Sequence, residues 1–266
     1  MNIVAIIPAR MGSSRFPGKP LEPIMGVPMV GHVYLRTVMA DKLSDTWVAT
    51  CDQEIFDYIE SIGGKAVMTA NTHERCGDRC AEAMLKIEEM TGKKIDVVVL
   101  VQGDEPFTTP EMVNAAVEAM ETAKAKGIGI ACLMGEIKTK EEFEDRNCIK
   151  VVVNYQNEAI YMSREPIPTM CKGATEGPWY KQVCLIPYTR DYLIEFNHLE
   201  PSQLEIAESI DLNRCIQHGH KVQMAMSPGR AISVDTPADL EHAEKVMSTE
   251  DKLVGKYLET AKAAAA

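Results

Sequence analysis

Apolar runs and helical repeats follow one another along the first half of the chain. Residues 3–7 form an uninterrupted apolar run typical of a buried strand in a parallel sheet, and residues 95–101, which are apolar except for Asp96, form a second strand-like run. Apolar residues three to four positions apart indicate helices in the segments 29–39, 55–62, 81–87 and 110–120. Shorter strand-like runs occupy residues 46–50, 66–68 and 128–134. This alternation predicts an α/β fold with a mainly parallel central sheet and helices on both faces.

The pattern changes after about residue 135. Residues 149–153 and 159–162 flank a polar turn, which predicts a β-hairpin. The loop 163–181 is rich in proline and glycine, and a loop of such length inside a compact chain is usually functional or mobile. The remaining expected elements are a strand near 183–186, a helix from about 201 to 217, a strand near 222–226 and a helix that begins after Asp235-Thr236-Pro237.

These elements predict one α/β domain over residues 1–247 rather than two independent domains. Residues 149–190 would form a β-rich insertion in that domain, and residues 248–266 a C-terminal helix or tail. The alanines that end the printed sequence are typical of a frayed helix end or of an expression remnant.

The overall charge of the chain narrows the classes of partner. The chain has 266 residues, 45% of them hydrophobic, and a formal net charge of −11. An acidic chain repels phosphate except where cations gather, so we expect neither nucleic acid nor a membrane surface as a partner. The first residues lack the features of a secretory signal, and no apolar stretch approaches the ~20 residues that span a bilayer. We therefore expect a cytoplasmic protein.

The 8 cysteines show no paired spacing, and in a cytoplasmic chain they are expected to be reduced, small apolar residues. His73, Cys76 and Cys80 would share one face of a helix, which leaves a zinc site as an alternative. The sequence offers no obvious fourth ligand for that site and no CxxC pair. Ordinary buried cysteines are therefore the favoured interpretation.

The loop over residues 8–20 carries the clearest candidate chemistry. It follows the first predicted strand and contains glycines, serines and prolines together with Arg10, Arg15 and Lys19. Small and rigid residues let the backbone approach a ligand closely, and the three cations suit dense negative charge such as a triphosphate. The loop is not a Walker A motif, because Pro20 stands where that motif needs Ser or Thr. The alternative is a solvated basic loop.

Two acidic residues complete a candidate site. Asp104 follows the strongest apolar strand, and in open α/β sheets ligands bind beyond such strand ends. Asp235 lies far along the chain, at the end of what we expect to be another strand. If both strands belong to one sheet, the two carboxylates could flank one Mg²⁺ ion. Each residue also has an ordinary explanation, Asp104 in a turn and Asp235 before a helix start.

Five motifs occur together in a characteristic order. They are Pro8-Ala9-Arg10 with 15–21, Val101-Gln102-Gly103-Asp104-Glu105-Pro106, Ser163-Arg164-Glu165-Pro166, Leu204-Glu205-Ile206-Ala207-Glu208-Ser209 and Val234-Asp235-Thr236-Pro237. With these motifs the chain resembles the 3-deoxy-manno-octulosonate (Kdo) cytidylyltransferases, also called CMP-Kdo synthetases, over nearly its whole length. The resemblance implies a nucleotide-diphospho-sugar transferase-like fold, CTP and Mg²⁺ as requirements, a homodimer, and a role in lipopolysaccharide biosynthesis. It also implies that the anomeric hydroxyl of a sugar acid attacks the α-phosphorus of CTP and that pyrophosphate leaves.

The resemblance also assigns residues to roles. It implies catalytic roles for Arg10, Lys19, Asp104 and Asp235, with the two aspartates as metal ligands. It implies nucleotide contacts from Pro8, Ala9, Arg10, Arg15, Lys19, Arg75, Cys76, Asp78 and Gln102. It implies substrate contacts from Arg164, Gln182, Glu205 and Glu208, with the β-rich insertion on the substrate side.

The chain departs from the family pattern in the segments that would recognise the base and the sugar acid. Residues 73–79 have Arg75-Cys76-Gly77 where the family has Ser-Gly-Thr, which helps recognise cytosine. Gln182, Ile186 and Ile206 replace polar residues of the family's acceptor motifs. Since unpaired hydroxyls of a buried polyol are unfavourable, the acceptor pocket is predicted to be altered. A different anionic acceptor, a different nucleotide, and a non-catalytic nucleotide-binding module therefore stay open as alternatives.

Overall fold

The computed structural model describes residues 1–12, 16–169, 177, 179–259 and 261. The predictions made for Arg15 and for the last alanines lie outside these residues. The chain divides into two compact units, of which the first comprises Met1–Asn114 and Gly229–Ala266 and the second comprises Ala115–Pro228. The second unit contains the whole segment 149–190 that the sequence sets apart as β-rich.

The first unit contains a parallel sheet whose strand order within the unit is β6-β1-β4-β5. The strands are β1 (Ile3–Ala9), β4 (Asp45–Thr50), β5 (Ala66–Met68) and β6 (Val97–Val101). Strands β1 and β6 are buried along their whole length, as uninterrupted apolar runs predict. The chain moves outward from β1 to β4 and β5 and then returns to β6 on the other side of β1. The carboxyl ends of β1 and β6 thus meet at a topological switch point, where ligands of α/β folds bind.

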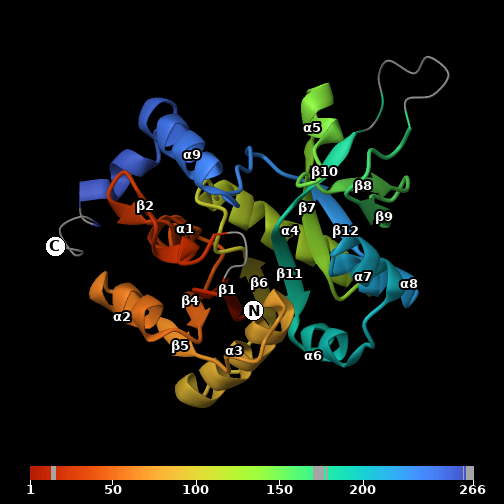
Figure 1. The fold of residues 1–266 in the computed structure, drawn as a ribbon. Helices are drawn as coiled ribbons and strands as arrows, with labels where there is room; N and C mark the ends of the chain where they lie inside the picture. Colours follow the sequence, from red (N-terminus) through yellow and green to blue (C-terminus); the bar gives the residue numbers. More distant parts are fainter. Residues whose placement is uncertain (13–15, 170–176, 178, 260, 262–266) are drawn as a thin grey trace. The chain divides into compact units, whose positions relative to one another are not determined.

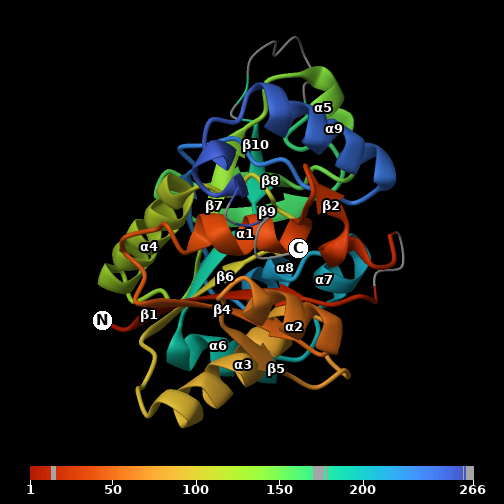
Figure 2. The same ribbon diagram turned by 90° about the vertical axis from the view of Figure 1, so that its left-hand side faces the viewer.

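Helices cover both faces of this sheet. Figures 1 and 2 show α1 (Met29–Thr37) on one side of β1 and β4, and α3 (Cys76–Thr91) on the other. Helix α2 (Gln53–Ser61) packs on β4 and β5 through the fully buried Ile55 and Ile59. Helix α3 ends at Gly92, whose φ of 66° is left-handed, a conformation that glycine adopts without strain. The predicted α/β fold class is confirmed.

Elements from both ends of the chain complete the first unit. They are the short helix η1 (Lys19–Leu21), the hairpin of β2 (Pro23–Ile24) and β3 (Val27–Pro28), α4 (Pro110–Ala125), which runs on into the second unit, α9 (Pro237–Thr249) and η3 (Val254–Lys256). Apolar residues of β2, β3, α9 and η3 and of the adjoining loops form one cluster, in which Ile24, Phe107, Val234 and Tyr257 are all buried. The C-terminal segment is therefore part of the core of this unit.

A buried polar chain fastens this C-terminal segment to α1. Arg36 donates from Nε to the hydroxyl of Tyr257 (2.7 Å) and from its NH2 group to Asp251 (2.5 Å). His32 Nε2 lies 2.8 Å from the carbonyl of Ile24, which can only accept, so Nε2 carries the proton. His32 Nδ1 then accepts from the Tyr257 hydroxyl at 2.6 Å. Each side chain in this hydrogen-bonded network has a partner, so the network fixes one arrangement of the C-terminal segment against α1.

The second unit has a mixed sheet in the order β12-β7-β10-β8-β9. The strands are β7 (Ala131–Glu136), β8 (Lys150–Val153), β9 (Ala159–Ser163), β10 (Tyr180–Val183) and β12 (Gln223–Met226). Strands β8 and β9 form the predicted antiparallel hairpin. The side-chain amide of Asn213 binds both backbone groups of Met162. Its oxygen accepts from the Met162 N–H (3.3 Å), and its nitrogen donates to the Met162 carbonyl (2.9 Å). A side chain thus occupies hydrogen-bonding positions of β9, an edge strand of this sheet.

Two predictions for the second unit are wrong. The strand expected near 183–186 is two strands, β10 and β11 (Leu185–Thr189), and the helix α6 (Arg190–His198) that follows was not predicted. The helix expected over 201–217 is two short helices, α7 (Gln203–Glu208) and α8 (Leu212–Gln217). Ser209 has a φ of 52° between them, and a left-handed residue ends a helix. Helix α5 (Lys140–Glu144) also belongs to this unit.

Candidate functional site

The loop after β1 borders a cavity of about 260 Å³ in the first unit. Residues from several parts of the chain line the cavity: Pro8, Ala9, Arg10, Gly12, Lys19, Pro20, Cys76, Gln102, Gly103, Asp104 and Asp235. Gly18 has a φ of 78° and places Lys19 at the start of η1, where Lys19 is 9% exposed. The structure therefore brings together most of the predicted phosphate-loop residues and both predicted acids.

Lys19 links the two acids directly. Its Nζ lies 2.7 Å from Asp104 Oδ2 and 3.2 Å from Asp235 Oδ1. Burial alone would lower the pKa of Lys19, but the two carboxylates outweigh burial and raise the pKa above its ordinary value. Lys19 is therefore a firmly charged ammonium, and the two carboxylates converge on one point in space.

Gly103 allows Asp104 to reach that point. A Cβ atom at position 103 would lie 2.8 Å from the carbonyl oxygen of Pro8, a distance that real Cβ atoms essentially never show. The end of β6 can thus approach the end of β1 only because residue 103 has no side chain. This close approach sets the position of Asp104 relative to the loop after β1.

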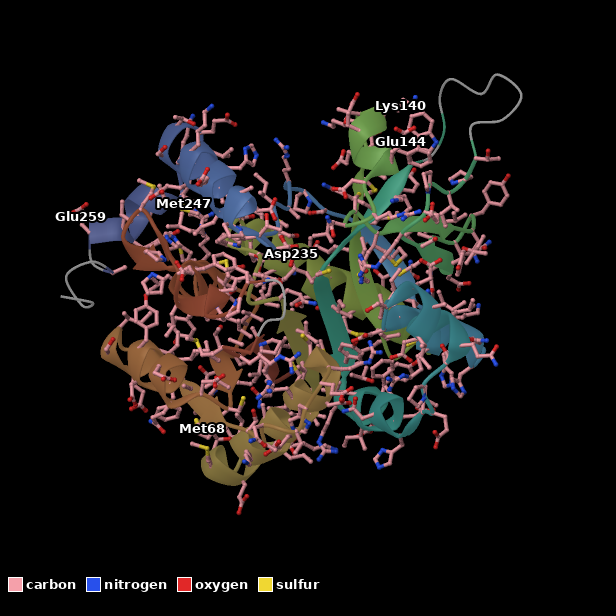
Figure 3. The ribbon with its side chains drawn as sticks, viewed as in Figure 1. Met68, Lys140, Glu144, Asp235, Met247 and Glu259 are labelled. Carbon is pink, nitrogen blue, oxygen red and sulfur yellow. The ribbon has the colours of Figure 1, made fainter. Side chains whose placement is uncertain are left out.

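Asp235 reaches the cavity without a strand. Residues 227–236 form no helix or strand, so the expectation that Asp235 ends a strand of the same sheet is wrong. The backbone N–H of Val234 instead donates to the carbonyl of Asp104 at 3.0 Å. Asp235 (Figure 3) lies just before α9, which begins with a capping box formed by Thr236 and Asp239. Hydrogen bonds of its neighbours, rather than sheet pairing, therefore hold Asp235.

The donor set suits a magnesium ion. The described residues contain no group of three or more His, Cys, Asp or Glu side chains able to hold a metal. Mg²⁺, however, is commonly bound by one or two carboxylates together with water and substrate phosphates. Asp104 and Asp235, whose oxygens already surround one cationic group, supply that number of hard ligands.

A second, smaller cavity of about 80 Å³ lies at the start of α3. Its lining consists of Pro8, Ala9, Arg10, His73, Glu74, Arg75, Cys76 and Arg79. Cys76 lines both cavities, and its Sγ lies 3.6 Å from Oε1 of Gln102. Cys76 thus lies beside Gln102 and next to Arg75 in the chain, and the role of these three residues as nucleotide contacts stays a prediction. Asp78 lies in the first turn of α3 but does not line either of these cavities of the described chain.

Sequence reasoning did not select Arg79, although it lines the smaller cavity. Arg79 is 3% exposed, and its NH1 group donates to Oγ1 of Thr69 (2.5 Å) and to the carbonyl of Ala70 (3.3 Å). His73, considered as a zinc ligand with Cys76 and Cys80, lies before α3 and pairs with Glu82. The only sequence signal for Arg79 was its place directly after Asp78.

The predicted substrate residues lie in the second unit. Glu208 accepts hydrogen bonds from the hydroxyls of Tyr161 (2.8 Å) and Ser163 (2.7 Å) and from the backbone N–H of Arg164 (2.9 Å). Burial would raise the pKa of Glu208, but these donors lower it overall, so the carboxylate stays ionised. The guanidinium of Arg164 donates to the carbonyls of Glu208 (2.7 Å), Arg146 (2.9 Å) and Ser209 (3.3 Å).

Glu205 and Gln182 have different surroundings. Glu205 is fully buried, caps α7 together with Ser202, and forms two hydrogen bonds with Arg214 at 2.6 and 2.7 Å. The prediction that Glu205 touches substrate gains no support from this position. Gln182 lies on β10, and its Nε2 is 3.7 Å from the sulfur of Cys132. Of the two further departures from the family pattern, Ile186 is 6% exposed and Ile206 is 65% exposed.

The fold and the cavity are those of a nucleotide-binding α/β protein, and comparisons with known proteins make the class specific. A family model described as cytidylyltransferase matches residues 4–251. The chain belongs to this cytidylyltransferase family.

Individual relatives match over most of their length. The 3-deoxy-manno-octulosonate cytidylyltransferase of Geotalea uraniireducens is 38% identical over 91% of this chain and 97% of that protein. The 8-amino-3,8-dideoxy-manno-octulosonate cytidylyltransferase of Shewanella piezotolerans is 38% identical over 92% of this chain and 98% of that protein. A solved structure of CMP:2-keto-3-deoxy-manno-octonic acid synthetase complexed with CTP has a TM-score of 0.85 and 36% identity, covering 94% of this chain and 100% of that one. The family resemblance predicted from the motifs is confirmed.

Among the described residues, no helix combines the length and the apolar character that crossing a bilayer would require.

Proposed function

We propose that this protein transfers CMP from CTP to the anomeric hydroxyl of Kdo or a related 2-keto-3-deoxy sugar acid, with Mg²⁺ required, and releases pyrophosphate. The observation that carries the proposal is the convergence of Lys19, Asp104 and Asp235 on one cavity beside the loop after β1. Cytidylyl transfer depends on positioning and charge neutralisation more than on a covalent nucleophile. The cavity offers cations and carboxylates for both tasks.

The triphosphate would bind to the loop after β1. Arg10, Arg15 and Lys19 carry the positive charge of this loop. The side chains of Arg10 and Lys19 both line the larger cavity. Guanidinium and ammonium groups held in a partly buried cavity attract phosphate oxygens more strongly than the same groups in open solvent. Pro8 and Ala9 would form the wall against which the nucleoside lies.

Asp104 and Asp235 would hold the Mg²⁺ ion. When bound, this ion would neutralise charge that develops on the departing pyrophosphate and lower the pKa of a coordinated hydroxyl. Lys19 occupies the space between the two carboxylates in this structure. We infer that the ammonium moves from the carboxylates to a phosphate oxygen when the nucleotide and the ion enter, so charge stays balanced at each stage.

Recognition of the base would fall to residues at the start of α3 and at the end of β6. Arg75, Cys76, Asp78 and Gln102 are the predicted contacts, and Cys76 lines both cavities. The segment lacks the hydroxyls of the family's Ser-Gly-Thr. Preference for CTP would therefore rest on backbone groups, on the amide of Gln102 and on the surrounding arginines.

The acceptor would contact Arg164 and Glu208 in the second unit, with Gln182 nearby in the chain's β10 strand. Two acceptors deserve equal tests, because relatives named for Kdo and for its 8-amino analogue are both 38% identical to this chain. The family-pattern departures at Gln182, Ile186 and Ile206 support testing both. An amino group at C8 changes a hydrogen-bonding hydroxyl into a cation, so it requires different partners.

Pyrophosphate release tests the proposal. The protein is incubated with CTP, MgCl₂ and, in turn, Kdo, 8-amino-3,8-dideoxy-manno-octulosonate and other 2-keto-3-deoxy sugar acids. We expect release with one of these acids, at least tenfold slower with UTP than with CTP, and abolished by Asp104→Asn. Lys140→Ala, a change of an exposed residue on α5, serves as the control that leaves release unchanged. No release with any acid would contradict the proposal.

We also infer that the protein is a homodimer in solution. The family resemblance implies a homodimer, and exposed apolar side chains such as Tyr155, Ile160 and Ile206 would contribute to its interface. Light scattering coupled to size-exclusion chromatography would give twice the mass of the 29.4 kDa chain. A mass equal to a single chain at all concentrations would contradict this inference.

A further inference from the structure

Contacts of individual residues position the segment that carries Asp235. Residues 227–236 form no strand, so no ladder of backbone bonds sets their register. Three contacts beside Asp104 contribute to the position of the segment. The Val234 N–H donates to the Asp104 carbonyl (3.0 Å), the Val234 side chain is buried in the apolar cluster, and the Ser233 hydroxyl donates to Glu105 Oε1 (2.5 Å).

Alternating side-chain directions link the contact of Ser233 to the direction of Asp235. Where successive side chains point to opposite sides, residues 233 and 235 point the same way and Val234 points the other way. The structure agrees, because Val234 enters the core while Ser233 and Asp235 face Glu105 and the Lys19–Asp104 pair. Whatever holds the Ser233 hydroxyl therefore also holds the direction of the Asp235 carboxylate.

Glu105 is well placed to hold that hydroxyl. It is 6% exposed and belongs to a tight turn in which its N–H donates to the Gln102 carbonyl (3.3 Å) and its carbonyl accepts from Thr108 (3.0 Å). A hydrogen bond from a hydroxyl to a carboxylate is shorter and stronger than a neutral one. Asp104 and Glu105 are neighbours in this turn. The turn therefore positions the Asp104 carboxylate directly and the Asp235 carboxylate through the contact between Glu105 and Ser233.

We propose that Glu105 and Ser233 are positioning residues that hold Asp235 beside Asp104 and so set the affinity of the site for a divalent cation. This inference rests on the proposed function, because it concerns the two acids assigned to Mg²⁺. Neither Glu105 nor Ser233 touches the cation in this assignment. Ser233 is exposed, so removal of its hydroxyl creates no cavity in the core.

Direct binding of Mn²⁺, followed by the electron paramagnetic resonance signal of the free ion, tests the inference without nucleotide or turnover. Outer-shell hydrogen bonds of this kind typically contribute about tenfold or more to metal affinity. We expect Ser233→Ala to weaken Mn²⁺ binding about tenfold, and to raise by a similar factor the Mg²⁺ concentration that gives half-maximal activity. Ser233→Thr, which keeps the hydroxyl, restores wild-type values. Glu105→Gln, which keeps an acceptor oxygen but loses the charge, falls between the two.

Ser248→Ala is the matched control. Ser248 lies on α9, and its hydroxyl donates to a backbone carbonyl, that of Lys245, at 2.9 Å. This variant should bind Mn²⁺ as the wild type does, and the thermal midpoints of all the serine variants should agree closely. Asp104→Asn distinguishes a failure of the proposed metal site from a failure of the positioning role. If it leaves Mn²⁺ binding unchanged, the proposed metal site is wrong. If it abolishes binding while Ser233→Ala does not weaken it, the metal site stands and the positioning role is wrong.

Discussion

Lys19 and Asp104 form a short ion pair, with 2.7 Å between the ammonium nitrogen and the carboxylate oxygen, in a place where a metal ion and a triphosphate are expected to meet. The ammonium thus lies beside two like-charged carboxylates and offsets their mutual repulsion. A divalent cation that binds to the same carboxylates would have to displace the ammonium, so Lys19 would compete with the ion.

Exchange between Lys19 and the metal can be tested with Lys19→Met, which keeps the length of the side chain but removes its charge. We expect Mn²⁺ to bind this variant more tightly than the wild type in the absence of nucleotide, because the competing ammonium is gone. CTP binding should weaken by roughly tenfold or more, as expected when a charge-assisted hydrogen bond of about 1.5–3 kcal/mol is lost. Isothermal titration calorimetry measures both affinities. Weaker binding of both ligands would contradict the exchange.

The buried pair of Arg36 and Asp251 should contribute strongly to stability. Their side chains are only 1% and 10% exposed, and Asp251→Ala would leave the guanidinium buried without its carboxylate. Breaking a buried pair from one side typically costs about 3–5 kcal/mol. Urea denaturation followed by circular dichroism measures the loss.

An exposed ion pair provides the comparison. Lys140 and Glu144 on α5 (Figure 3) are 3.5 Å apart, with 67% and 56% of their side chains exposed. Glu144→Gln should change the free energy of unfolding by less than about 1 kcal/mol, because water screens such pairs. Similar losses for Asp251→Ala and Glu144→Gln would show that the C-terminal segment is not held by Arg36.

His32 should make the protein less stable in mild acid. Burial, helped by the nearby Arg36, lowers the pKa of His32 from 6.5 to about 4, although the carbonyl of Ile24 opposes that shift. Between these two pH values the unfolded state binds a proton that the folded state does not. The contribution of neutral His32 is therefore complete above pH 6.5 and is lost as the pH falls towards 4, by about 3 kcal/mol in total.

Urea titrations at several pH values would detect this loss. His32→Gln removes the titrating group, so the stability difference between wild type and variant should shrink as the pH falls from 6.5 to 4. His242→Gln, on the outer part of α9, is the matched control and should leave the pH dependence of the wild type unchanged. A constant difference between wild type and His32→Gln across this range would contradict the prediction.

Gly103→Ala should disturb both folding and catalysis. The added methyl group would lie 2.8 Å from the Pro8 carbonyl, so β1 and the turn at Asp104 would have to separate. Overpacking of this kind typically costs about 1–3 kcal/mol. Gly255→Ala, where no atom lies within 4 Å of the added Cβ, is the control with near wild-type stability. Thermal unfolding and pyrophosphate release measure the two effects, and a fully active Gly103→Ala enzyme would contradict this account.

The sequence predicted the first half of the fold well because its strands are buried on both faces. Such strands need continuous apolar runs, as β1 and β6 have, and these runs are visible without any knowledge of pairing. The helix expected over 201–217 failed for a local reason. The residue types in this segment do not predict the left-handed backbone of Ser209, because tertiary contacts rather than helix propensity determine the conformation there.

The candidate site was predictable in its chemistry but not in its construction. Asp104 and Asp235 could be paired from residue type and motif, yet the expected strand before Asp235 does not exist. The roles of Glu105 and Ser233 depend on contacts 128 positions apart, which no local pattern encodes. Glu205 is the opposite example. It belongs to a recognisable motif and was predicted to contact the substrate, but in the structure it caps a helix and pairs with Arg214.

The return of the chain to the first unit after residue 228 has a consequence for protein synthesis. Asp235 follows Lys19 by 216 positions, and Tyr257 comes later still. A nascent chain therefore displays the loop after β1 and the Asp104 turn long before it gains the second carboxylate and the segment that Arg36 fastens. A product truncated anywhere in the second unit lacks Asp235 and the segment that pairs with Arg36, so such fragments should be inactive and open to proteolysis.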